Sequence, residues 1–173
     1  MPKNWVEFSL GEIPMNKVNQ SKVEVEHEKS PKGSFEIVRR HISVALGGKR
    51  DVGVWGGGHP FDVELAVIPK GKKGYPYHAH AAQTEYYIFV SGSGIFIDGV
   101  GQEHAVSEGD HVIVHPGEAH QVVNISDQDL RYYVIADNHR SDVSTYPKTG
   151  KRFIKPETRC VRVEDAEYYL GEE

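Results

Sequence analysis

The chain has 173 residues, a formal net charge of -5, and 38% hydrophobic residues. This length fits one domain, and the composition is that of a globular protein with a core of its own. No apolar run approaches the roughly 18 residues of a membrane helix. The basic residues are spread along the chain and do not form the one-sided patch that nucleic-acid binding requires. We therefore expect neither a membrane nor a nucleic acid as a partner.

Two further features concern the cellular compartment. The first residues, Met1 to Glu7, lack the apolar stretch of a signal peptide. Cys160 is the one cysteine, so an internal disulfide cannot form. Both features predict a cytoplasmic location.

Apolar residues at every second position predict strands in the first third of the chain. Val23 and Val25 alternate with charged residues, and Ile42, Val44 and Leu46 repeat the pattern. A period of two is that of a strand with one buried face.

The middle of the chain has the clearest alternation. Between 61 and 67, Phe, Val, Leu and Val occupy every second position, with Asp62 and Glu64 among the residues between them. Short β-rich runs separated by turn residues such as Gly92 and Gly117 follow it. These runs predict strands at 75–80, 85–90, 95–98, 111–114, 120–124 and 130–135.

Many short strands without a convincing amphipathic helix predict an all-β sandwich, barrel or jelly roll. We expect one domain over 1–173, with a core barrel at about 35–137. An N-terminal extension of strands would cover 1–34, and 138–173 would form an extended C-terminal tail, in which 161–170 is a short strand or a helical turn.

Four residues form a candidate metal site. His78 and His80 are two apart, so on a strand their side chains point to the same face. Glu85 follows after enough residues for the chain to turn back, and His120 comes directly after the turn 116–119. Three imidazoles and one carboxylate suit a borderline divalent ion such as Zn, Fe, Mn, Ni or Cu.

The spacing of these residues resembles the cupin superfamily. His78-x-His80, four residues, Glu85, six residues and Gly92 is similar to the first cupin motif, and Gly117, His120 and Asn124 match the end of the second. The resemblance implies a double-stranded β-helix, or jelly-roll barrel, with the metal held inside by His78, His80, Glu85 and His120. The match departs from the pattern in two turns, where Gly74 is offset and His115 replaces a proline.

Other residues near the motifs are assigned structural roles. His104, His111 and His115 are interpreted as exposed strand or turn residues. Asn124 is expected to hold backbone near the site. Tyr87 and Phe89 share a face with Glu85, and the sequence leaves open whether they are core residues or border the ligand cavity.

The function stays open between two classes, because a scaffold does not decide a reaction. The first is a metalloenzyme acting on a small oxygen-rich metabolite, either as an isomerase of a sugar or sugar phosphate or as a dioxygenase. The alternative is a non-catalytic cupin that binds a sugar or carboxylate. In both cases a small-molecule ligand occupies the barrel.

A homodimer is expected from the second face of the predicted strands. Tyr75, Tyr77 and Ala79 have the opposite parity from the histidines, as Tyr86, Ile88 and Val90 have from Glu85. If the ligands face inward, these groups face outward, and a strand that is apolar on both faces needs cover on both sides. A second subunit or a terminal strand would supply that cover.

Overall fold

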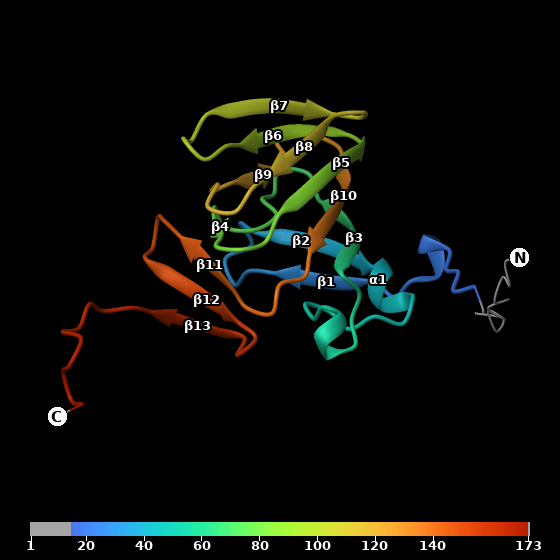
Figure 1. Cartoon of the computed structure of the whole chain (residues 1–173). Coiled ribbons are helices and arrows are strands. Elements are labelled where there is room, and N and C mark those ends of the chain that lie inside the picture. The colour runs from blue at the N-terminus through green and yellow to red at the C-terminus, as the bar shows by residue number, and fades with distance from the viewer. Residues whose placement is uncertain (1–14, 173) are drawn as a thin grey trace, which may run out of the picture.

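The computed structural model describes residues 15–172, which fold into three antiparallel sheets (Figure 1). The largest sheet has six strands. In spatial order these are β1 (Glu26–Lys29), β2 (Glu36–His41), β3 (Phe61–Ile68), β10 (Leu130–Asp137), β5 (Glu85–Ser91) and β8 (His111–Val114).

A three-stranded sheet packs against the large one. It has the order β7 (Glu103–Ser107), β6 (Ser93–Ile97) and β9 (Gln121–Val123). Both sheets contribute side chains to one buried cluster, which includes Phe89 from β5, Phe96 from β6 and Val122 from β9. Two antiparallel sheets around one core form the jelly-roll barrel that the sequence predicts.

The third sheet corrects the expectation of an extended C-terminal tail. Its order is β13 (Arg159–Arg162), β12 (Lys151–Lys155), β11 (Asp142–Tyr146) and β4 (Ala79–His80). Figure 1 shows it at one side of the barrel. Residues 142–162 are therefore paired strands, and they join the barrel through β4, which carries His80.

The expected strand at Ile42 is also wrong. Residues 42–45 form a turn of helix, α1 (Ile42–Ala45). Two short 3-10 helices, η1 (Gln20–Lys22) and η2 (Val54–Gly56), lie elsewhere in the chain. The Ser43 hydroxyl donates to Asp62 Oδ1 at 2.8 Å and accepts from the Val63 amide, so tertiary contacts override the local alternation. Within residues 15–172, the helices are too short or too polar to cross a membrane.

The strand β3 has the predicted period but not the expected inward face. Ala66 and Ile68 are almost fully buried in the core, and Asp62, of the same parity, is 8% exposed. Phe61, which alternation assigns to the apolar buried face, is 49% exposed. The face of β3 that carries Asp62 and Glu64 thus points into the barrel. Largely buried charged residues of this kind indicate a polar site inside the barrel as well as a hydrophobic core.

Candidate metal centre

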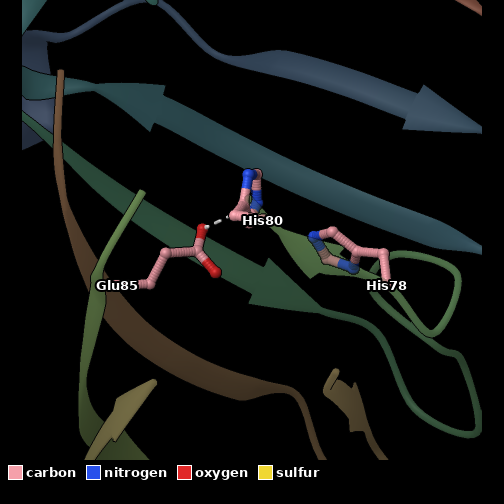
Figure 2. Close-up of side chains that lie close together, drawn as sticks. All are labelled: His78, His80 and Glu85. Atoms are coloured by element: carbon pink, nitrogen blue, oxygen red, sulfur yellow. Dashed lines mark ion pairs between the residues drawn. The ribbon is translucent and has the colours of Figure 1, made fainter. Parts of the chain in front are cut away.

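The four predicted ligands come from three segments: the segment that ends in β4, the start of β5, and the residue before β9. His78 and His120 are bridged by two backbone hydrogen bonds, of 3.1 Å and 2.8 Å between amide nitrogen and carbonyl oxygen. His80 lies on β4, and Glu85 begins β5. Figure 2 shows His78, His80 and Glu85 pointing toward one another.

The donor atoms of His78, His80 and Glu85 all lie within 4.8 Å of one another. His80 Nε2 is 3.8 Å from Glu85 Oε1, the contact that is dashed in Figure 2. His120 is outside that mutual cluster but adjoins it, because its Nε2 lies 2.8 Å from Glu85 Oε2 and its ring centre lies 4.7 Å from that of His78. The structure thus brings all four predicted ligands together.

The hydrogen bonds of the three imidazoles show that the donor set fits a metal. Nδ1 of His78 lies 2.8 Å from the Pro76 carbonyl, and Nδ1 of His120 lies 3.3 Å from the Glu118 carbonyl. A carbonyl only accepts, so each Nδ1 carries a proton and each Nε2 offers a lone pair. His120 Nε2 and Glu85 Oε2 are then two acceptors 2.8 Å apart, which requires a metal ion or a further proton between them.

His80 is held in the same tautomer by a carboxylate. Its Nδ1 donates to Asp142 Oδ2 at 2.6 Å, and Asp142 Oδ1 accepts from the Ala82 amide at 2.8 Å. This is the arrangement in which a second carboxylate orients a metal-binding histidine. Asp142 is not among the predicted site residues, although the β-branched residues Val143 and Thr145 that alternate beside it indicate a strand.

A match to a known family covers the residues that hold this site. Residues 64–136 match the family model described as a cupin domain. The chain thus resembles cupins over the segment that holds all four predicted ligands. None of the curated proteins matches it significantly.

Solved structures share the fold of this chain at low sequence identity. A sugar phosphate isomerase of the cupin superfamily from Silicibacter pomeroyi aligns with a TM-score of 0.69 and 20% identity, over 84% of this chain and 92% of that one. A protein from Acidithiobacillus ferrooxidans for which sugar phosphate isomerase activity is suggested aligns at 0.68 and 22%, with the same coverage. The polyketide cyclase RemF from Streptomyces resistomycificus aligns at 0.58 and 19%, over 92% and 94% of the two chains.

The charges at the centre suit an unprotonated His78 and an ionised Glu85. Burial, with the neighbouring His120, lowers the pKa of His78 to about 4, so it is unprotonated near pH 7. Burial would raise the pKa of Glu85, but a proton held between its carboxylate and His120, together with the other two imidazoles, outweighs burial and lowers the pKa to about 2. Burial likewise opposes ionisation of Asp142, whose pKa is nevertheless held well below its usual range, chiefly by the hydrogen bond from His80.

Tyr87 resolves the question that the sequence leaves open. It is 5% exposed, its hydroxyl donates to Glu85 Oε2 at 2.9 Å, and it lies 3.0 Å from His120 Nε2. Burial raises its pKa well above the usual value, so it stays a donor. Tyr87 and Phe89 both pack in the core, but only Tyr87 also borders the cavity, where it positions Glu85.

The centre opens into a cavity of about 420 Å³. Its walls come from the large sheet, from the segment before β4 and from the C-terminal sheet. Tyr75 is one of the lining residues and its hydroxyl accepts from Arg39, so the expectation that it faces outward is wrong. A cavity of this size and polarity accommodates a small metabolite.

The same cavity contains a carboxylate that is not a predicted ligand. Glu64 of β3 lines it, with 17% of its side chain exposed. Glu64 Oε1 lies 2.7 Å from His41 Nδ1, and His41 Nε2 lies 2.6 Å from Glu26 Oε2. The imidazole of His41 therefore bridges two carboxylates. Of Glu26, His41 and Glu64, only Glu64 lines the cavity.

The remaining residues near the motifs have the structural roles that the sequence analysis assigns. Asn124 is 1% exposed, and its amide donates to the Ile68 and Gln128 carbonyls at 2.8 and 2.7 Å. His104, His111 and His115 are exposed and lie outside the cluster of ligands.

Proposed function

We propose that this chain is a divalent-metal-dependent isomerase that acts on a sugar or sugar phosphate. The proposed ligands are His78, His80, Glu85 and His120. A bound divalent ion would supply a Lewis acid that polarises the substrate carbonyl. Zn, Fe, Mn and Ni all suit this donor set.

The position of Glu64 is the observation that favours isomerisation over the other reactions. An aldose–ketose isomerisation moves one hydrogen between adjacent carbons and one between their oxygens, so it needs a group that takes up and returns a proton. Glu64 lines the cavity of the metal centre without belonging to the ligand set. His41 and Glu26 hold its carboxylate in place from behind, as a third group orients the base in other acid–base sites.

Two further features support an oxygen-rich substrate of modest size. Polar side chains line much of the cavity, among them Gln83, Ser144, Tyr146 and Asp62. The two structures with the best overall alignment reported above have names that refer to sugar phosphate isomerases.

The test measures metal content first and proton exchange second. The protein is loaded with Zn, Fe, Mn or Ni and incubated in D₂O with a panel of aldoses, ketoses and their phosphates. NMR then follows isomerisation and deuterium incorporation next to the carbonyl. We expect Glu64→Gln to keep its metal and to slow exchange by about 10²- to 10⁴-fold, the contribution of a positioned base.

Glu108→Gln is the matched control, because Glu108 is exposed on the turn before β8. It should exchange at the wild-type rate. Oxygen consumption with any panel member would favour a dioxygenase instead. Tight substrate binding without exchange in the wild type would favour a non-catalytic binding protein.

A further inference from the structure

One segment of the chain beyond the matched cupin domain, residues 148–162, is strongly basic. Residues 148–162 contain six basic side chains and one acidic one, a net charge of +5 in a chain whose total is -5. The expectation that the basic residues are spread along the chain is therefore wrong for this segment, where they are concentrated. This segment forms β12 and β13, and it supplies Lys151 and Lys155 to the wall of the metal cavity.

Strand register places one of these cations close to a metal ligand. Ser144 of β11 pairs with His80, and two residues further on the Tyr146 ring stacks on His78, with 6.0 Å between ring centres and 24° between planes. Tyr146 in turn pairs with Lys151 of β12. The Lys151 ammonium lies 5.5 Å from the centre of the Tyr146 ring, a cation–π contact that limits where the ammonium can go.

Lys151 differs from the other cations of the cavity wall, because no carboxylate of the described residues pairs with it. Arg39 and Arg50 both pair with Glu26, at 2.6 and 3.1 Å, and Lys155 pairs with Asp51 at 2.7 Å. Within residues 15–172, no carboxylate lies within 4.0 Å of the Lys151 ammonium. The wall cations are Arg39, Arg50, Lys151 and Lys155.

The acidic groups of the wall are already engaged elsewhere. Asp62 accepts from the Ser43 hydroxyl and from the Asp51 amide, and Glu64 is bonded to His41. A half-buried ammonium without a partner is electrostatically unfavourable, and a divalent ion in the same cavity would add to the positive charge. An anionic ligand would offset the positive charge of the ammonium and that of the divalent ion.

We propose that Lys151 binds a carboxylate or phosphate group of a substrate whose other, oxygen-bearing end reaches the metal ligands. This inference rests on the proposed function and narrows its substrates to anionic metabolites. Lys151 is a binding residue in this scheme, and Tyr146 positions it. The basic C-terminal sheet would also attract such a substrate at low ionic strength.

The experiment compares ligands that differ by one anionic group. Calorimetry measures the affinity of ribose 5-phosphate against ribose, and of malate against lactate. The protein is tested both metal-loaded and metal-free, at low ionic strength. In the wild type, the member with the additional group should bind at least tenfold more tightly in one pair, which identifies the group as phosphate or carboxylate.

Three variants test whether Lys151 causes the preference for the ligand with the additional anionic group. Lys151→Met should lose about tenfold in affinity for the preferred ligand, the effect of one charge-assisted hydrogen bond. Lys151→Arg should keep most of the preference. Lys148→Met is the matched control, because Lys148 is exposed on the same hairpin and lies over Tyr77, away from the cavity wall.

The outcomes separate this inference from the proposed function. Equal affinities within both pairs in the wild type would overturn the role of Lys151, as would the same loss in Lys148→Met as in Lys151→Met. Lack of metal uptake or of proton exchange would count against the proposed function. The preference would still be tested by the metal-free titrations, since Lys151 belongs to the chain whether or not a metal is bound.

Discussion

At the scale of single residues, the three imidazoles of the metal centre differ in what holds them. His78 and His120 donate from Nδ1 to backbone carbonyls, whereas His80 donates to the buried carboxylate of Asp142. A carboxylate raises the basicity of the metal-facing nitrogen and fixes the ring more strongly than a neutral acceptor does. We therefore expect Asp142 to contribute to metal affinity without contacting the ion.

This role predicts the effect of Asp142→Asn. We expect metal affinity to fall about 10- to 100-fold, because the amide lacks the negative charge that supports His80. Competition with a coloured chelator would measure the change. Asp127→Asn, on an exposed turn, is the control and should bind metal as the wild type does. Unchanged affinity in Asp142→Asn would mean that the carboxylate serves only to join β11 to the barrel.

At the scale of elements, charged side chains link β1, β2 and β3 on the inner face of the large sheet. His41 of β2 lies between Glu26 of β1 and Glu64 of β3, with Arg50 nearby. The hydrogen bond to Glu64 is the main cause that raises the pKa of His41 above its usual value, against the opposing effects of burial and Arg50. The protonated imidazole thus stabilises the folded sheet.

The direction of this shift predicts a pH dependence of stability. Because the pKa is higher in the folded state, the stabilisation is complete below about pH 6.5 and is lost as pH rises through the folded pKa. We expect the difference in Tm between wild type and His41→Gln to shrink by roughly 2 to 4 °C for each kcal/mol lost over that range.

Thermal unfolding from pH 5 to 9 would measure the difference. His104→Gln removes an exposed histidine that pairs with Asp98, and its Tm difference from the wild type should depend less on pH. A constant difference between wild type and His41→Gln across this range would refute the stabilising role of the His41 proton.

At the scale of the whole molecule, the outer face of the large sheet carries a row of apolar side chains. Register places Val63, Ile135, Tyr86 and Ile113 side by side on four neighbouring strands. Tyr86 is 37% exposed and Ile113 51%. On the same face, the chain itself makes one contact, in which the Tyr133 hydroxyl donates to Gln20 of η1.

We propose that a second copy of the chain covers this row, in agreement with the expected homodimer. Leaving the row in water forgoes roughly 25 cal/mol for each Å² of apolar surface. Light scattering should give twice the chain mass of 19.4 kDa. Ile113→Glu should shift the protein toward a monomer, whereas Val100→Glu, at an exposed loop residue outside the row, should not. A monomeric wild type would reject the dimer.

Local sequence identified the four proposed ligands and determined most of the barrel strands. Two histidines two residues apart share a strand face whatever surrounds them, and the spacing to Glu85 and His120 needs no knowledge of distant contacts. The strands β3, β5, β6, β8, β9 and β10 likewise follow from alternation and turn residues, because period and turn chemistry act over a few residues.

Only the tertiary structure decided which side chains meet across the barrel. Alternation identifies β3 but not that Asp62 and Glu64 face the cavity, since the inner face depends on which strands pair beside it. Asp142 reaches His80 from 62 residues away, and Lys151 reaches the cavity only through the register of β11 and β12. Such contacts form between residues that are far apart in the sequence, and a pattern over a few neighbouring residues does not predict them.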